Sequence, residues 1–264
     1  MIHPTAIIHP KAKLDPTVRA GPFAVIDAGV ELGADCIVGP HVYLTGLTTI
    51  GSNNRFHAGC VIGDAPQDLK YKDEPTRLRI GDGNVFREHV TVHRSTKPDA
   101  ETVIGSANYF MANSHVAHNC SIGNQVILAN GALLGGHAVV QDGAFISGNC
   151  LVHQFTRIGA LSLMQGGAGI SKDLPPFCLA LGVNEMCGLN VVGLRRAGIQ
   201  ADGRMELKRL YHLLFRSGKK LREALDEARK NFSGEAAKTM LEFIAEARRG
   251  VCADTGGAPA DGNE

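Results

Sequence analysis

An apolar residue recurs at every sixth position through most of this chain, and this period excludes the common helical and sheet folds. Ten positions spaced by six, from Ile8 to Ile62, all hold apolar residues, and so do twelve more from Ile104 to Ile170. Three further hexads from Ile80 bring the total to 25. A period of six matches neither the roughly 3.6 residues of an α-helix nor the roughly 2 of a β-strand.

Each hexad has room for one short strand and one corner. The large aliphatic residue points inward, the residue two positions earlier is mostly small, and Gly or Asn takes the turn. Three hexads close a triangular coil of about 18 residues, so the repeats predict a solenoid of about eight stacked coils, a parallel β-helix. Four cysteines occupy the small inward position and are predicted to be core residues: Cys36, Cys60, Cys120 and Cys150.

The breaks in the period mark the domain organisation. We expect the solenoid over residues 1–183, with external loops at about 64–79 and 94–103, where the hexads are interrupted. Leucines at helical spacing, such as Leu207, Leu210 and Leu214, predict a C-terminal helical domain over residues 184–250. The last segment, 251–264, is rich in Gly, Ala and Asp and is expected to be disordered.

Composition and net charge limit the classes of function that this protein can have. The net charge of +1 argues against nucleic acid as the main partner, and no apolar stretch approaches the roughly 20 residues of a membrane-spanning helix. The start of the chain lacks the pattern of an export signal, and seven irregularly spaced cysteines without a CxxC pair suit a reducing cytosol. We therefore expect a cytoplasmic protein.

Charge is unevenly distributed along the chain. Residues 195–249 hold 14 Lys and Arg against 8 Asp and Glu, a net charge of +6. These side chains either cover solvated helix faces or form a docking surface for an acidic partner or for phosphate groups. The sequence leaves both interpretations open.

The histidines suggest where chemistry takes place. His137 follows His118 by 19 residues, one coil plus one, so the two are expected on adjacent coils, with His93, His115 and His153 on the same face. An imidazole can act as a general base, and backbone N–H groups beside glycines, as in Gly135–Gly136, can bind an oxyanion. A metal site is not predicted, because the HxxH spacing differs from that of the zinc enzymes built on hexapeptide repeats.

Several segments resemble one family. The stretches GDAPQDLKYKDEPTRLRIGDGN, REHVTVHR, NSHVAHNC, ILANGALLGGH, VHQF and GLNVVGLRR are similar, in order over about residues 1–250, to the UDP-N-acetylglucosamine O-acyltransferases. The resemblance implies a left-handed β-helix and transfer of a 3-hydroxyacyl chain from acyl carrier protein to the 3-hydroxyl of UDP-N-acetylglucosamine, the first step of lipid A synthesis. It also implies a homotrimer with sites between subunits and no cofactor besides the phosphopantetheine of acyl carrier protein.

The resemblance also assigns site residues. It makes His118 the general base and the backbone N–H of Gly136 the oxyanion donor, while Gly166 occupies the position that limits acyl length. The other residues that it places at the substrates are Asp68, Lys70, His93, His115, His137, His153, Gln154, Asn190 and Arg196.

The chain departs from the family pattern at three positions. Asn119 follows the expected base, where familiar members carry Asp; a neutral amide adds no charge, so the base is expected to titrate lower than in those members. Val192 and Ala197 replace an acidic and a basic residue, which leaves open a related acyltransferase that acts on a 3-amino UDP-sugar to give an amide. A non-catalytic or metal-binding β-helix protein is the further alternative. The length of the acyl chain stays open.

Overall fold

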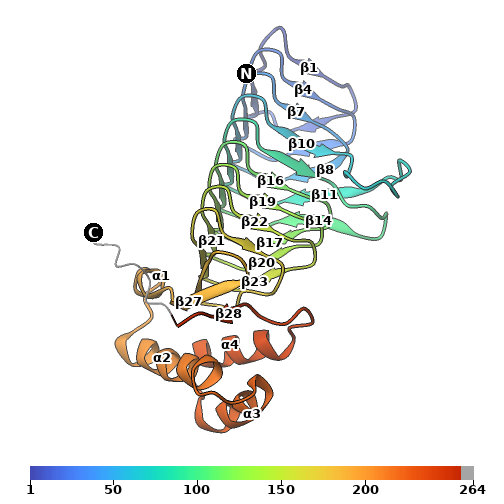
Figure 1. Cartoon of the computed structure of the whole chain (residues 1–264). Helices are drawn as coiled ribbons and strands as arrows, with labels where there is room; N and C mark the ends of the chain where they lie inside the picture. Colours follow the sequence, from blue (N-terminus) through green and yellow to red (C-terminus); the bar gives the residue numbers. More distant parts are fainter. Residues whose placement is uncertain (257–264) are drawn as a thin grey trace.

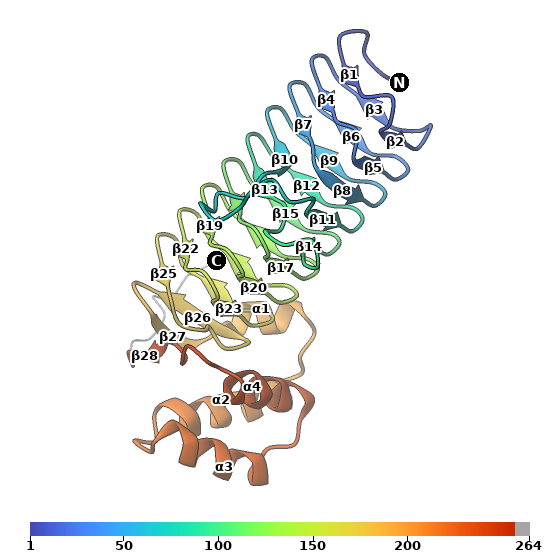
Figure 2. The same cartoon turned by 90° about the vertical axis from the view of Figure 1, so that its right-hand side faces the viewer.

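The hexads form a three-sided prism of stacked coils. In this computed structural model, which describes residues 1–256, the coils run along one axis from the N-terminus to a small group of helices (Figures 1 and 2). Strands β1 to β25 each supply one wall of one coil, and three parallel sheets result. The 25 hexads of the sequence correspond one to one to these 25 strands.

Up to β25, the strands of each sheet are three apart in chain order. The first sheet contains β1 (Ile7–Ile8), β4 (Val25–Ile26), β7 (Tyr43–Leu44), β10 (Val61–Asp64), β13 (Thr91–His93), β16 (His115–Val116), β19 (Leu133–Leu134), β22 (Leu151–Val152) and β25 (Gly169–Ile170). The second contains β2 (Lys13–Leu14), β5 (Val30–Leu32), β8 (Leu47–Ile50), β11 (Arg77–Ile80), β14 (Glu101–Ile104), β17 (Ser121–Ile122), β20 (Val139–Val140) and β23 (Arg157–Ile158). The third contains β3 (Arg19–Ala20), β6 (Ile37–Val38), β9 (Arg55–Phe56), β12 (Val85–Phe86), β15 (Tyr109–Phe110), β18 (Ile127–Leu128), β21 (Phe145–Ile146), β24 (Leu163–Met164), β26 (Cys178–Leu181), β27 (Glu185–Leu189) and β28 (Ala253–Asp254).

The register confirms the predicted coil length. Ile127 pairs with Phe145, and His115 pairs with Leu133, each an offset of 18 residues. The apolar hexad residue of each strand points into the prism, and from Ala20 onward these residues are buried. The four inward cysteines are buried as well, as predicted.

Two ladders run inside the prism. The rings of Phe56, Phe86 and Phe110 stack with centroids 4.9 and 4.8 Å apart. At the small inward position, Asn84 Nδ2 donates to Asn54 Oδ1 (2.9 Å), and Asn108 Nδ2 donates to Asn84 Oδ1 (2.9 Å). Because these side chains are buried, every bond in the amide ladder replaces one that water would make in the unfolded chain.

We expect Asn84→Ala to destabilise the protein by about 2–4 kcal/mol. The substitution leaves the backbone N–H of Asn108 and one of its two Nδ2 hydrogens, both of which donate to Asn84 Oδ1, without that acceptor in the core, while the other Nδ2 hydrogen keeps its bond to the carbonyl of Gly123. Urea denaturation at fixed protein concentration measures the loss. Asn130→Ala, at an exposed corner, is the control, and an equal cost for both variants would contradict the ladder argument.

The two insertions leave the prism at the same corner, between the first and second sheets (Figure 1). They are shorter than predicted: residues 65–76 lie between β10 and β11, and residues 94–100 lie between β13 and β14. The predicted end at 103 is wrong because β14 already begins at Glu101. The predicted end at 79 is wrong because Arg77 and Arg79 alternate with buried Leu78 and Ile80 in a regular strand. The outward charged side chains of these arginines are typical of a loop, although β11 pairs with a neighbouring strand on each side.

The helical domain begins later than predicted. Residue 184 lies in a turn and residues 185–189 are strand rather than helix, since β27 pairs antiparallel with β26 and buries Met186 and Cys187. The helices that follow are α1 (Val191–Arg196), α2 (Ala201–Phe215), α3 (Leu221–Asn231) and α4 (Glu235–Ala245). They bury Leu207, Leu210 and Leu214 of α2 against their neighbours. Within residues 1–256, no helix is long and apolar enough to cross a membrane.

The expectation of a disordered tail is wrong for residues 251–256. Strand β28 pairs parallel with β27, and Asp254 accepts bonds from the Tyr211 hydroxyl (2.6 Å) and from Arg216 Nε (2.7 Å). These contacts depend on residues about 40 positions upstream, and local composition carries no sign of them. Residues 257–264 of that expected tail lie outside the described residues.

Candidate active site

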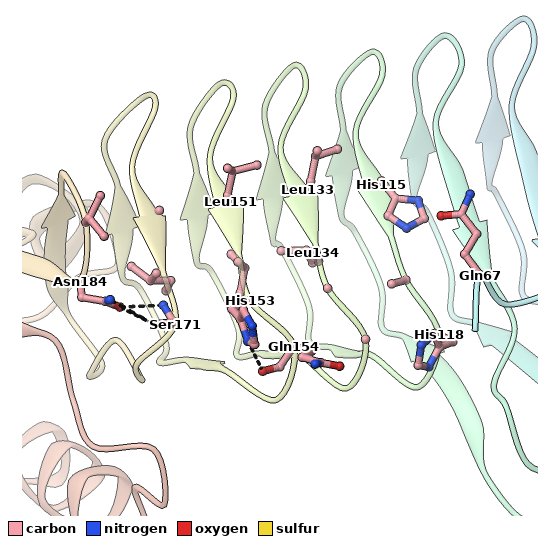
Figure 3. Close-up of a pocket in the computed structure, with 17 residues that line it drawn as sticks. Gln67, His115, His118, Leu133, Leu134, Leu151, His153, Gln154, Ser171 and Asn184 are labelled. Atoms are coloured by element: carbon pink, nitrogen blue, oxygen red, sulfur yellow. Dashed lines mark hydrogen bonds between the residues drawn. The ribbon is translucent and has the colours of Figure 1, made fainter. Parts of the chain in front are cut away.

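A groove of about 640 Å³ lies along the face of the prism formed by β16, β19, β22 and β25 (Figure 3). Gln67 lies at one end and Asn184 at the other, and His118 lies along one edge. The outward residues of neighbouring coils, Leu133 and Leu151, are 41 % and 54 % exposed and line the groove. The groove therefore combines an apolar surface with a few polar groups, as a site for an amphiphilic substrate requires.

His118 lies against the backbone of the next coil. A Cβ added at Gly136 would be 2.6 Å from His118 Cε1 and 2.7 Å from Nε2, so only glycine leaves room for the ring. Among residues 1–256, the N–H of Gly136 donates no backbone hydrogen bond, whereas the neighbouring Gly135 and His137 both do. A basic ring nitrogen and an unused N–H donor thus lie side by side at the groove.

The residue that follows His118 holds its ring. Asn119 adopts a left-handed backbone with φ of +59°, a conformation that Asn tolerates better than most residues. Its Oδ1 lies 2.9 Å from His118 Nδ1. The same oxygen accepts bonds from the backbone N–H of Thr96 (3.1 Å) and from its hydroxyl (2.9 Å). The second insertion is therefore connected to His118 by hydrogen bonds through the side-chain amide of Asn119.

His93 and His115 lie beside His118 and are partly or fully buried. Their rings meet edge to face with centroids 4.9 Å apart, and Thr91 Oγ1 lies 2.7 Å from His115 Nδ1. Burial, with the neighbouring histidines, lowers the pKa of His115 to about 4, and burial also lowers the pKa of His93. Both rings are therefore neutral at neutral pH and act as polar rather than charged groups.

We expect the protein to lose stability as the pH falls from about 6.5 to about 4, in part through His115. The folded state binds this proton only near pH 4, whereas the unfolded chain binds it near the ordinary pKa of about 6.5, so acid favours unfolding. The loss between pH 7 and pH 5 is at most about 2 kcal/mol for this group. Urea denaturation at both pH values should show a smaller loss for His115→Gln than for the wild type or for the exposed control His3→Gln. An equal loss for all three would contradict this assignment.

Comparison with known proteins connects this site to a family. A family profile described as UDP-N-acetylglucosamine O-acyltransferase, domain 2, matches residues 173–252, and a profile described as bacterial transferase hexapeptide (six repeats) matches residues 101–136. Two proteins named acyl-[acyl-carrier-protein]–UDP-N-acetylglucosamine O-acyltransferase are similar to the chain. That of Syntrophobacter fumaroxidans is 44 % identical and that of Thermodesulfovibrio yellowstonii 45 %, each over 95 % of this chain and 98 % of the relative.

A solved structure gives the same result. The UDP-N-acetylglucosamine acyltransferase of Francisella novicida superposes with a TM-score of 0.92 at 34 % identity, over 97 % of this chain and 95 % of that chain. The chain belongs to the UDP-N-acetylglucosamine O-acyltransferase family. Its membership confirms the predicted fold class, a left-handed parallel β-helix followed by a small helical domain.

The structure brings several of the residues expected from the O-acyltransferase family to the groove. His115, His118, Gly136, His153 and Gln154 all line it. His153 is exposed, and its Nδ1 lies 3.0 Å from the carbonyl oxygen of Gln154 (Figure 3). His93 is buried directly behind His115, and its Nδ1 has no partner within residues 1–256.

His137 lies at the adjoining corner. Its ring stacks on Phe155 with centroids 4.5 Å apart and meets His118 edge to face at 5.4 Å. The two histidines from adjacent coils are therefore in contact, as predicted. His137 packs against the ring of His118 and does not line the groove.

Other residues expected in an O-acyltransferase site do not line the groove within one chain. Asp68 accepts a bond from the backbone N–H of Lys70 (2.9 Å), and Lys70 is exposed beside the fully exposed Leu69 on the first insertion. Gly166 lies at an exposed corner, where an added Cβ would meet only the carbonyl oxygen of Gly148 at 3.6 Å.

Asn190 and Arg196 belong to α1. Asn190 caps this helix: its Oδ1 accepts from Gly193 N–H (2.9 Å) and its Nδ2 donates to the carbonyl of Leu161 (2.8 Å). Both polar ends of the amide are therefore occupied within the fold. Arg196 is exposed at the end of α1 and does not line the groove.

Several groove residues were not predicted. They are Gln67, Leu133, Leu151, Ser171, Val183 and Asn184. The two leucines carry a signal in the sequence, because they are large apolar residues at outward positions of the hexad, where a solvated face prefers polar side chains. The others lie on insertions or beyond the last hexad, where the period gives no position.

Within the described part of the chain, no three His, Cys, Asp or Glu side chains are arranged to hold a metal ion.

Proposed function

We propose that this enzyme transfers a 3-hydroxyacyl chain from acyl carrier protein to the 3-hydroxyl of UDP-N-acetylglucosamine, the first step of lipid A synthesis. The observation that carries the proposal is the contact between the His118 ring and the backbone of Gly136 at an apolar groove. The relatives from Syntrophobacter fumaroxidans and Thermodesulfovibrio yellowstonii are both named as O-acyltransferases of this nucleotide sugar, which favours the ester product over the amide alternative.

His118 and the N–H of Gly136 are sufficient for a balanced acyl-transfer step. His118 Nε2 takes the proton of the sugar hydroxyl as its oxygen attacks the thioester carbonyl carbon. The negative charge that develops on the carbonyl oxygen is stabilised by the N–H of Gly136. The ester C–O bond forms as the C–S bond breaks, and the proton on Nε2 passes to the leaving thiolate of phosphopantetheine. No cofactor beyond that carrier group is needed.

The groove suits the acyl chain. Leu133 and Leu151 lie outward on neighbouring coils, and Gly169 continues the same column of the first sheet. An acyl chain laid along this column would cover exposed apolar surface, at roughly 0.8 kcal/mol per buried methylene.

We propose that the active enzyme is a homotrimer whose sites lie between subunits. In one chain, Asp68 and Lys70 are on an insertion that projects from the prism, and Asn190 and Arg196 lie away from the groove (Figure 1). A neighbouring subunit would bring such groups to the sugar and nucleotide. Light scattering with size-exclusion chromatography tests the oligomeric state.

The helical domain suits the acyl carrier protein. Basic side chains Arg195, Arg204 and Lys208 line a hollow of about 570 Å³ between α1 and α2. An acidic carrier protein would be attracted to such a surface. We place the enzyme and this partner in the cytoplasm.

Mass spectrometry of the product tests the function. Purified enzyme is incubated with 3-hydroxyacyl carrier proteins of several chain lengths and with UDP-N-acetylglucosamine or its 3-amino analogue. We expect an ester of UDP-N-acetylglucosamine and free carrier thiol, and the most rapidly consumed donor reports the chain length. Transfer to the amino analogue alone would replace this proposal with the amide-forming alternative.

A further inference from the structure

The proposed reaction requires a particular tautomer of His118. A neutral imidazole carries one N–H, so only one of its nitrogens can accept a proton. Nε2 lies beside Gly136 at the groove, whereas Nδ1 faces Asn119. Catalysis by Nε2 therefore requires the ring proton on Nδ1, so the surrounding structure must favour the Nδ1–H tautomer.

The contacts of Asn119 make the selection. The backbone N–H of Thr96 can only donate, so the amide atom that faces it at 3.1 Å must be the oxygen. The same oxygen faces His118 Nδ1 at 2.9 Å, which makes Nδ1 the donor. If the amide were reversed, its NH₂ would face the N–H of Thr96, and Nδ1 would become the acceptor. The proton would then occupy Nε2 and remove the base.

Thr96 is held firmly enough to do this. The preceding residue, Ser95, is fully buried, and its hydroxyl donates to the carbonyl of Ala100 (2.6 Å), which closes the second insertion. On the other side, the backbone N–H of Asn119 donates to Thr102 Oγ1 of β14 (2.8 Å). Both partners of the contact are thus fixed to neighbouring coils of the prism.

We propose that Thr96 is a positioning residue: through Asn119, it holds His118 in the tautomer whose Nε2 accepts the substrate proton. The inference rests on the proposed function of His118. It applies to this chain because residue 119 is Asn, whose amide has an acceptor oxygen at one end and a donor NH₂ at the other. A carboxylate there would present an acceptor in either orientation and would need no such selection.

Thr96→Pro, Thr96→Val and Asn119→Asp, singly and combined, test the proposal. Proline removes the backbone N–H that requires an oxygen at Asn119, so we expect kcat to fall by about three- to tenfold, the effect of one neutral hydrogen bond, with little change in KM. Valine keeps that N–H and loses only the hydroxyl, which can accept as well as donate, so kcat should stay within about twofold of the wild type. In the Asn119→Asp background, Thr96→Pro should cost less than about twofold, because either carboxylate oxygen accepts from Nδ1.

Two outcomes would overturn the proposal. An equal loss from Thr96→Pro in both backgrounds would show that Thr96 only holds the insertion in place, and no loss in the Asn119 background would show that it selects nothing. Nitrogen-15 NMR of the His118 ring, assigned with His118→Gln, gives a readout independent of turnover. We expect the Nδ1–H tautomer in the wild type and in Thr96→Val, and a mixture in Thr96→Pro. If the wild type forms no ester, the proposed function fails, while the NMR comparison still decides the tautomer.

Discussion

His118→Ala should lower kcat by about 100- to 10,000-fold while leaving the fold intact. The loss is the typical contribution of a general base. The ring lies outside the prism, at the groove, so its removal takes no side chain from the apolar core. Steady-state assays with 3-hydroxyacyl carrier protein and UDP-N-acetylglucosamine measure kcat, and thermal unfolding checks the fold.

The matched control is His9→Ala, an exposed histidine on the first coils, which should retain full activity. If His118→Ala kept more than a few per cent of wild-type turnover, the general-base assignment would be wrong. A fall in activity that came with a large fall in melting temperature would count against it too, because the loss would then be structural.

Gly136→Ala should lower kcat by about 100-fold or more. The new Cβ would lie 2.6 Å from His118 Cε1, closer than real atoms approach, so the ring must move. A displacement of about 1 Å at a catalytic group is enough for a loss of this size. The backbone N–H is retained, so the variant separates the position of the base from the presence of the oxyanion donor.

Gly148→Ala is the control for this substitution. An added Cβ at Gly148 meets only the carbonyl oxygen of Asn130 at 3.4 Å, an ordinary contact, so activity and stability should stay close to those of the wild type. Equal activity of Gly136→Ala and Gly148→Ala would mean that the ring of His118 does not work from the observed position.

The hexad period predicted most of the fold because it reports a local constraint. Every sixth residue must be apolar to point into a prism, and each coil repeats the same arrangement 18 residues later, so Ile127 and Phe145 were paired by counting alone. The same counting placed His118 and His137 on adjacent coils. It failed at the strand edges of the insertions, where the outward arginines of β11 looked like loop sequence.

Other features depend on residues that meet across long distances in the chain, and there the period has no information. Residues 251–256 join the sheet through β28 and Tyr211, and Asn190 is occupied as a helix cap. Thr96 reaches Asn119 across 23 positions from an insertion whose length interrupts the repeat.

The residues alone therefore determined the coil, its number of turns, the placement of His118 and His137 on adjacent coils, and the family. Only the folded chain decided which nitrogen of His118 faces the groove. The physical reason is that a repeat dictates which side chains share a wall, whereas the orientation of one amide depends on donors brought from outside the repeat.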